Sequence, residues 1–323
     1  MHIFHSIQEI PANFGPSVVT IGNFDGVHRG HQVVLRDVIA RARALHARSI
    51  AVTFDPHPIR VVRPQISLRL ITQQEQKLAW LAHSGIDAVL VLPFTRELSR
   101  LTAREFARTI LHDSLKAVEV HEGENFRFGA DAGADVNELS SLGEEFGFKV
   151  HVHSPTHRRG KIVSSSAVRG AIAAGNMRAA RQLLGRPFEI IATPAPGRGY
   201  GSRYTVPTIN LAPYKELLPA NGVYITCLEV NGERFESVTN VGNRPTFGSE
   251  SFAVETHILD FHPIALDEST QIRLLFLDRL RAEIVWPSPQ ALKEQIGKDV
   301  ARARHYFLLY QNLFGLNPQA QES

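Results

Sequence analysis

Residues 18–31 read Val18-Val19-Thr20-Ile21-Gly22-Asn23-Phe24-Asp25-Gly26-Val27-His28-Arg29-Gly30-His31. The first four residues predict a short buried strand, and a helical pattern begins near Gly30 and runs to Ala44. A strand, a tight loop and a helix N-terminus in this order present backbone N–H groups and a positive dipole end to an anion. Because His28 and His31 are three residues apart, we expect both imidazoles on one face of the helix, beside that anion.

The rest of the first half alternates strand-like and helix-like segments. The expected strands are 49–54, 87–92, 117–121 and 149–153, and the expected helices are 72–84, 102–111, 137–146 and 166–184. Thr72 with Glu75, and Thr102 with Glu105, have the spacing of capping boxes. This alternation is typical of an α/β fold with a parallel sheet. Ligands bind such sheets at the carboxyl ends of strands, where the loops 22–31, 54–58 and 123–129 fall.

The second half has the pattern of antiparallel β structure. Asn231-Gly232 lies between two strand-like runs and predicts a hairpin, and 252–261 and 271–280 also alternate as strands, which together favour a small β-barrel. Ser288 as N-cap and Pro289 at the first helical position predict a C-terminal helix. The expected apolar stripe of that helix is Leu292, Ile296, Val300 and Phe307. We therefore predict two domains, residues 1–186 and 187–323.

The composition narrows the class of protein. Of 323 residues, 35 are Lys or Arg and 32 are Asp or Glu, and without a long basic block this balance predicts no nucleic-acid partner. A single cysteine, Cys227, excludes an intrachain disulfide and favours a reducing compartment. Residues 1–16 lack the features of a signal peptide, and the most apolar run, 86–94, is too short to span a bilayer. The sequence predicts a cytoplasmic protein with no membrane partner.

Residues 22–31 resemble the His-x-Gly-His signature of the nucleotidylyltransferases. In its longer form the stretch resembles the bifunctional bacterial riboflavin kinase/FAD synthetase (FMN adenylyltransferase) family. Further segments resemble that family's motifs in the same order, namely 54–58, 123–129, 163–169, 207–210, 240–246 and 254–257. The resemblance implies a Rossmann-like nucleotidylyltransferase domain followed by a riboflavin-kinase-like barrel. It implies phosphorylation of riboflavin by ATP to FMN, then transfer of AMP from ATP to FMN to give FAD and pyrophosphate, both with Mg²⁺.

The resemblance also assigns roles in adenylyl transfer. It makes His28, His31 and Arg169 the catalytic residues. The implied contacts to ATP and its phosphates are Gly22, Asn23, Phe24, Asp25, Gly30, Ser164 and Ser165. The implied contacts to flavin are Phe54, Asp55, Pro56, His57, Asn125 and Phe128. A structural alternative for the serines is helix capping, by Ser165 or Ser166.

For the kinase half, the resemblance makes Glu255 the base that deprotonates the ribityl hydroxyl. Gly199 and Gly201 belong to the implied loop over the ATP phosphates, and Thr208 and Asn210 offer oxygens to the Mg²⁺ that ATP carries. Ser202 and Thr205 stand where the family has arginine and glycine. An alternative is therefore an adenylyltransferase alone, with a degenerate barrel as scaffold or flavin-binding module; a flavin-binding regulator without catalysis is a third hypothesis.

Three histidines near the end of the first half fall outside these motifs. His151 and His153 share one face of an expected strand, and His157 follows closely. Such an arrangement can bind zinc. No carboxylate or cysteine at suitable spacing completes the set, so the sequence does not predict a metal site there.

Overall fold

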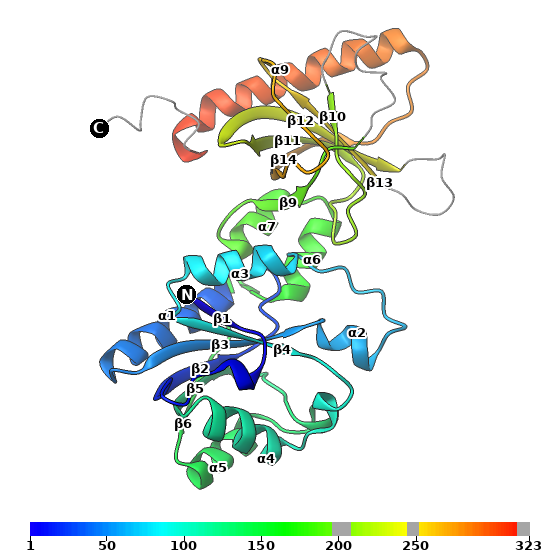
Figure 1. Ribbon diagram of the computed structural model, residues 1–323. Coiled ribbons are helices and arrows are strands. Elements are labelled where there is room, and N and C mark those ends of the chain that lie inside the picture. Colours follow the sequence, from blue (N-terminus) through cyan, green and yellow to red (C-terminus); the bar gives the residue numbers. More distant parts are fainter. Residues whose placement is uncertain (196–207, 244–251, 315–323) are drawn as a thin grey trace, which may run out of the picture. The chain divides into compact units, whose positions relative to one another are not determined.

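The computed structural model describes residues 1–195, 208–243 and 252–314 (Figure 1). The chain divides into two compact units, Met1–Ala167 and Val168–Ser323. Helix α6 (Ser165–Ala173) spans this division, and α7 (Met177–Leu184) lies between it and the predicted domain boundary at residue 186, which stays a prediction. Among the described residues, none of the helices combines the length and hydropathy needed to cross a membrane.

The first unit is built on a six-stranded sheet in which every neighbouring pair is parallel, in the order β1-β4-β3-β2-β5-β6. Its strands are β1 (His2–Phe4), β2 (Ser17–Ile21), β3 (Arg48–Asp55), β4 (Ala88–Pro93), β5 (Ala117–Gly123) and β6 (Lys149–His153). The predicted α/β fold is confirmed, although the sequence did not predict β1. The strands β3, β2 and β5 are neighbours, so the three predicted loops that follow them leave the same edge of the sheet.

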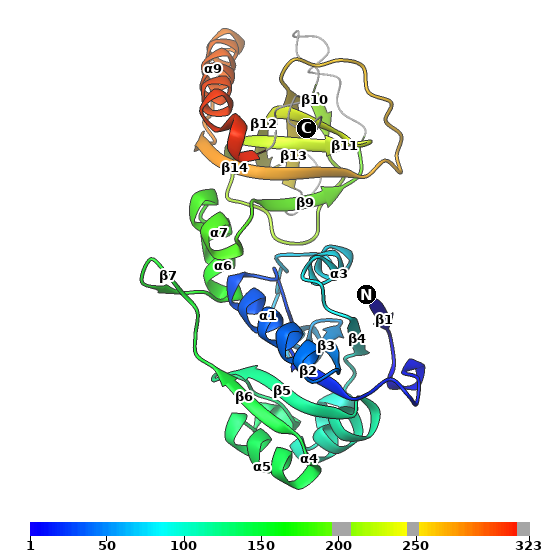
Figure 2. The same ribbon diagram turned by 90° about the vertical axis from the view of Figure 1, so that its left-hand side faces the viewer.

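Helices cover both faces of this sheet (Figures 1 and 2). On one face lie α1 (Arg29–Ala44) and α3 (Gln74–His83); on the other lie α4 (Ala103–Phe106), its π-helical continuation η3 (Ala107–Ser114), and α5 (Val136–Phe146). The adjacent residues Val18 and Val19 pack into the two different cores, and both are fully buried. Burial on both faces explains why the central strands β2 and β4 are mostly apolar.

Short elements complete the first unit. They are the 3₁₀ turns η1 (Ile7–Glu9), η2 (Leu98–Arg100) and η4 (Ala130–Ala132), helix α2 (Pro58–Val62), and the small hairpin of β7 (His157–Arg158) and β8 (Lys161–Ile162). The capping box at α4 is confirmed, because the Thr102 N–H donates to the Glu105 carboxylate at 2.8 Å and the Glu105 N–H donates to the Thr102 hydroxyl at 3.2 Å.

The second unit contains an antiparallel sheet in the order β10-β13-β12-β11-β14-β9. The strands are β9 (Phe188–Ala192), β10 (Thr208–Asn210), β11 (Gly222–Val230), β12 (Glu233–Asn243), β13 (Phe252–Ile258) and β14 (Ile272–Ala282). Just beyond the two edge strands, Pro194 pairs with Leu211, and the Ala195 N–H donates to the Asn210 carbonyl at 2.8 Å. This pairing joins the edges at one end and confirms the predicted barrel. Asn231 and Gly232 have φ of 51° and 81° and form the predicted hairpin turn.

Helix α9 (Pro289–Phe314) lies along the outside of this barrel (Figure 2). Its predicted start is confirmed, because the Ser288 hydroxyl accepts a hydrogen bond from the Ala291 N–H at 3.2 Å. The predicted stripe is wrong at Leu292 and Ile296, which are 40% and 38% exposed. The apolar side chains of α9 that pack against the barrel begin at Val300 and continue through Ala303, Tyr306 and Phe307. The first turns of the helix therefore lie outside the core.

The predicted single helix over 166–184 is also wrong, because the chain breaks it into α6 and α7. Gly175 has φ of +71°, and the Asn176 side chain caps the second helix by accepting the Ala179 N–H at 3.0 Å. A Cβ on Gly175 would lie 2.8 Å from the hydroxyl oxygen of Tyr224. Backbone conformation and close packing both require glycine at this break.

Candidate active site

The loop between β2 and α1 is held in a sharply turned conformation. Phe24, Gly26 and Val27 have φ of 47°, 80° and 37°, so three residues of four lie in the left-handed region. A Cβ on Gly26 would lie 3.0 Å from a methyl carbon of Ile71. Only glycine combines the required backbone with the available space, which explains the second glycine of the motif.

Asp25 anchors this loop from within. The side chain is 3% exposed, and its carboxylate accepts the backbone N–H of Ile71 at 2.9 Å and of Thr72 at 3.2 Å. The Thr72 hydroxyl in turn accepts the Gly26 N–H at 3.1 Å. Thr72 therefore supports the loop. Its predicted capping box with Glu75 is wrong, because α3 begins one residue later. At that start, the Gln73 N–H donates to the Gln76 side chain at 3.0 Å.

The two histidines of the motif stack on each other at the start of α1. The ring centroids of His28 and His31 are 3.6 Å apart with 14° between the planes, and Nδ1 of His28 accepts the His31 N–H at 3.3 Å as the helix cap. A Cβ on Gly30 would meet the His28 ring at 3.2 Å, so the glycine makes room for this ring. Phe24 packs against His31 at 5.1 Å between centroids. Both imidazoles thus lie together at a helix N-terminus, as the spacing predicted.

The electrostatics of this pair favour a neutral imidazole at position 31. Desolvation lowers the pKa of His31 well below its ordinary value, and the neighbouring His28 lowers it further by a smaller amount. Its Nδ1 atom is buried and has no hydrogen-bond partner among the residues that the structure describes. A ring nitrogen that lacks a protein partner at a helix N-terminus is suited to contact a ligand oxygen.

A buried lysine beside this loop was missed by the sequence reasoning. Lys77 on α3 is 7% exposed, and its amino group donates to the Thr53 hydroxyl at 3.1 Å and to the Phe54 carbonyl at 3.3 Å. Burial lowers its pKa to about 8, although Asp55 and Asp25 act in the opposite direction. The signal in the sequence was a lysine on the face of an expected helix that packs against the sheet.

The predicted flavin contacts on the other two loops at this sheet edge differ in burial: some side chains are buried and others are exposed to solvent. His57 is 9% exposed and caps α2, with Nδ1 accepting the Ile59 N–H at 3.2 Å, while Asp55 and Pro56 are exposed. The Phe54 ring meets Phe94 edge-on at 5.4 Å. In the third loop, the side chain of Asn125 is exposed.

Phe128 packs into the core of the first unit. It is 7% exposed, its ring lies 6.0 Å from that of Phe106, and its backbone pairs with Ala134 in both directions at 3.1 Å. The ring therefore supports the third loop from below. Its predicted contact with flavin stays a prediction.

The two serines at the start of α6 have different roles: one caps the helix and the other contacts the histidine loop. The Ser164 hydroxyl accepts the Ala167 N–H at 3.2 Å and so caps the helix, which is the structural alternative named for this group of serines. The Ser165 hydroxyl donates to the Asp25 carbonyl at 3.0 Å, which brings it to the histidine loop. Arg169 lies one turn further along α6, in the second unit.

In the barrel, Glu255 lies exposed on β13 between two asparagines. Its register partners are Asn210 on β10 and Asn240 on β12, so the three side chains share one face of the sheet. Thr208 is two residues before Asn210 and lies on the same face. Gly199 and Gly201, together with Ser202 and Thr205, lie outside the described residues.

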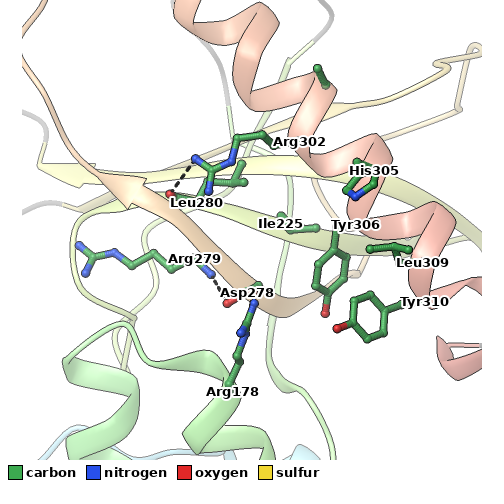
Figure 3. A pocket seen from close by; sticks show the side chains of 11 residues that line it. Arg178, Ile225, Asp278, Arg279, Leu280, Arg302, His305, Tyr306, Leu309 and Tyr310 are labelled. Carbon is green, nitrogen blue, oxygen red and sulfur yellow. Dashed lines mark hydrogen bonds and ion pairs between the residues drawn. The ribbon is translucent and has the colours of Figure 1, made fainter.

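The second unit also has a cavity of about 660 Å³ between α7, β14 and α9 (Figure 3). Arg178 and Asp278 form an ion pair at its wall, with N–O distances of 2.9 and 2.5 Å, and the rings of Tyr306 and Tyr310 lie 4.6 Å apart. Among the described residues, none of the predicted site residues lines this cavity.

Comparison with known proteins matches each half of the chain to a protein family. The family model described as FAD synthetase matches residues 10–167, and the one described as riboflavin kinase matches residues 184–307. The bifunctional riboflavin kinase/FMN adenylyltransferase of Pseudomonas fluorescens is 35% identical over 305 residues, covering 94% of this chain and 97% of that protein. The chain belongs to this bifunctional family. The protein of the same name from Escherichia coli K12 is 32% identical over 305 residues, 94% of this chain and 96% of that protein.

The bifunctional family is an enzyme family in both of its halves, and the matches support two transferase activities over adenylyl transfer alone. A crystal structure described as a macrolide-efflux protein from Streptococcus pneumoniae is also similar, with a TM-score of 0.85 and 27% identity. The similarity covers 94% of this chain and 98% of that one, so it extends over both halves.

Proposed function

We propose that this chain makes FAD from riboflavin in two ATP-dependent steps, with residues 187–323 forming FMN and residues 1–186 adenylylating it. Membership in the bifunctional family supports both steps. The buried, unpaired Cys227 is in keeping with work in the cytoplasm. The observation that carries the adenylyl-transfer half is the stacked His28–His31 pair at the N-terminus of α1.

In adenylyl transfer, an oxygen of the FMN phosphate forms a bond to the α-phosphorus of ATP. The bond from that phosphorus to the bridging oxygen breaks, and pyrophosphate leaves with the electron pair. A phosphate is already a nucleophile, so the protein's task is positioning and charge stabilisation. The imidazoles of His28 and His31 and the dipole of α1 face the developing negative charge, and Arg169 adds a fixed cation.

The surrounding residues complete this half. Gly22, Asn23, Phe24, Asp25 and Gly30 shape the backbone that the ATP phosphates approach, with Asp25 acting through the hydrogen bonds that order the loop. Ser164 and Ser165 continue this surface at the start of α6. The flavin lies toward the loops after β3 and β5, against Phe54, Asp55, Pro56, His57, Asn125 and Phe128.

In the kinase step, Glu255 takes the proton of the terminal ribityl hydroxyl of riboflavin. That oxygen then forms a bond to the γ-phosphorus of ATP, and ADP leaves with the bridging oxygen. Thr208 and Asn210 offer a hydroxyl and an amide oxygen on the face of the sheet that carries Glu255, and such neutral oxygens fit Mg²⁺ that ATP phosphates already hold. Bound Mg²⁺ would neutralise phosphate charge. Gly199 and Gly201 belong to the proposed phosphate loop.

The test is a product assay with purified protein. Riboflavin with ATP and Mg²⁺ is expected to give FMN and then FAD, and FMN with ATP and Mg²⁺ is expected to give FAD and pyrophosphate, all resolved by chromatography. FAD from supplied FMN, with neither flavin nucleotide formed from riboflavin, would overturn the kinase half. FMN accumulating without FAD would overturn the adenylyl-transfer half.

A further inference from the structure

Imidazoles and a carboxylate gather on strands β5 and β6, on the sheet face that α1 covers. Oε2 of Glu119 lies 3.3 Å from Nε2 of His121 and 3.4 Å from Nε2 of His151. The two rings stack with centroids 4.5 Å apart and 22° between the planes. The possible ligand atoms of the three residues all lie within 4.8 Å of one another. The cluster is independent of the residues proposed for either transferase step.

These separations match those between the ligands of a tetrahedral zinc ion. Zn–N and Zn–O distances are about 2.0–2.2 Å, and ligand atoms at the corners of such a tetrahedron are about 3.3–3.5 Å apart. The distances of 3.3 and 3.4 Å from Oε2 of Glu119 to the two Nε2 atoms fall in this range. An ion at this point leaves Glu119 and His121 in place and requires the partly exposed His151 ring to turn from its stack on His121, so that both Nε2 lone pairs point at the ion.

A row of polar contacts links the cluster to Asp37 on α1. Three contacts lie in a row: Glu119 Oε2 to His121 Nε2 at 3.3 Å, His121 Nδ1 to His153 Nε2 at 3.1 Å, and His153 Nδ1 to Asp37 Oδ2 at 3.4 Å. Ionised carboxylates only accept, so each hydrogen bond in this row takes its proton from an imidazole. When the protons of both imidazoles lie on Nδ1 atoms, the lone pair of His121 Nε2 faces the Glu119 carboxylate. A cation at that point satisfies both.

His151 offers a second imidazole nitrogen beside the same carboxylate oxygen, with Nε2 3.4 Å from Oε2 of Glu119. Its Nε2 atom is buried and makes no hydrogen bond to any residue that the structure describes. Its side chain as a whole is 41% exposed, so an ion can enter from solvent and keep a water ligand on that side. The two Nε2 atoms and one carboxylate oxygen then supply three protein ligands.

The surroundings supply the support that bound metals require. Arg41 on α1 donates to Oε1 of Glu119 at 2.5 Å and to Oε2 at 2.9 Å, which fixes the carboxylate plane. His121 Nδ1 lies 3.1 Å from His153 Nε2, and a proton on that Nδ1 leaves Nε2 for the ion, the arrangement that commonly orients metal-bound histidine. Glu119 and His121 are 3% and 2% exposed, so both are held rigidly.

We propose that Glu119, His121 and His151 bind one Zn²⁺ ion, with water as the fourth ligand. The ion ties the edge strand β6 to β5 and, through Arg41, to helix α1. The expectation from the sequence that no carboxylate completes the histidine set is wrong, because Glu119 and His121 come from the neighbouring strand. His157, the third histidine considered there, is exposed on the β7–β8 hairpin, with Nδ1 2.9 Å from the Pro155 carbonyl oxygen.

The test measures Zn²⁺ binding to tag-free, chelator-treated full-length protein by calorimetry, with Co²⁺ as a spectroscopic substitute. One Zn²⁺ per chain and the intense visible absorption of four-coordinate Co²⁺ are expected. His151→Ala and His121→Ala are each expected to weaken binding at least about tenfold. His151→Ala alters a partly exposed ring and keeps the test valid if His121→Ala fails to fold. His157→Ala is the matched control and is expected to bind as the parent does.

Three results would overturn the proposal. The first is no stoichiometric binding of Zn²⁺ by the parent protein. The second is equal weakening by His151→Ala and His157→Ala, which would indicate diffuse surface binding. The third is binding that survives His151→Ala and is lost in His31→Ala, which would place the ion at the histidine pair on α1.

Discussion

Lys77 is a buried amine beside the proposed adenylyl-transfer loop, and its replacement by methionine tests the electrostatics of that region. The amino group donates to the Thr53 hydroxyl and the Phe54 carbonyl, and burial lowers its pKa from 10.5 to about 8. Below the folded-state pKa the protein must hold a desolvated cation, which reduces its free energy of unfolding. Methionine has a similar length and no charge, so Lys77→Met removes this penalty.

The magnitude follows from the two pKa values. Because the unfolded chain binds the proton more tightly, the penalty is fully present below the folded pKa of about 8 and is relieved as the pH rises toward 10.5. One pKa unit corresponds to about 1.4 kcal/mol, so the penalty is about 3 kcal/mol at about pH 7 and about 1.5 kcal/mol at about pH 9.5. From about pH 7 to about pH 9.5, the free energy of unfolding of the parent should therefore rise by about 2 kcal/mol relative to that of Lys77→Met. Hydrogen bonds lost in Lys77→Met are a constant offset and leave this difference unchanged.

The assay uses tryptophan fluorescence during urea unfolding. The chain has two tryptophans, so a Trp286→Phe background leaves Trp80, which lies on α3 three residues after Lys77, as the reporter of the first unit. Free energies of unfolding are compared with and without Lys77→Met at the two pH values. Lys149→Met, at an exposed lysine on β6, is the control and should show no pH-dependent difference. A difference for Lys77→Met that stays constant with pH would refute the reasoning.

Three further predictions concern the proposed sites. His31→Ala should reduce FAD formation from FMN by at least about 100-fold, because it removes a contact to developing charge, while FMN formation from riboflavin is unchanged in the same chromatographic assay. Equal loss of both products would contradict separate sites. Glu255→Gln should reduce FMN formation by about 100-fold and spare FAD formation from supplied FMN; an unchanged kinase rate would remove Glu255 as the base. Gly26→Ala should cost about 1–3 kcal/mol in the Trp80 unfolding assay, since φ is +80° and the new methyl group would press on Ile71; a neutral effect would contradict the loop's dependence on glycine.

The features that the sequence predicted are those that depend on neighbours within a few residues. The strand before Gly22, the helix after His28 and the placing of His28 and His31 on one face all follow from periodicity and spacing, and the structure has each of them. The hairpin at Asn231-Gly232 depends in the same way on two adjacent residues. The misplaced capping box depends on a distant partner: the Thr72 hydroxyl accepts the Gly26 N–H, 46 residues away, and α3 begins one residue later than predicted.

The cluster around Glu119 shows the limit of such reasoning most sharply. Its ligand atoms come together because β5 and β6 pair in one register, with His121 opposite His151, and because helix α1 adds Arg41 above them. A shift of one residue in that pairing would turn the imidazoles of the two strands to opposite faces of the sheet. The local sequence does not indicate the register of an edge strand. In contrast, two histidines at i and i+2 on one strand can be recognised directly from their spacing in the sequence. A search for metal sites in parallel sheets should therefore begin from pairs of strands.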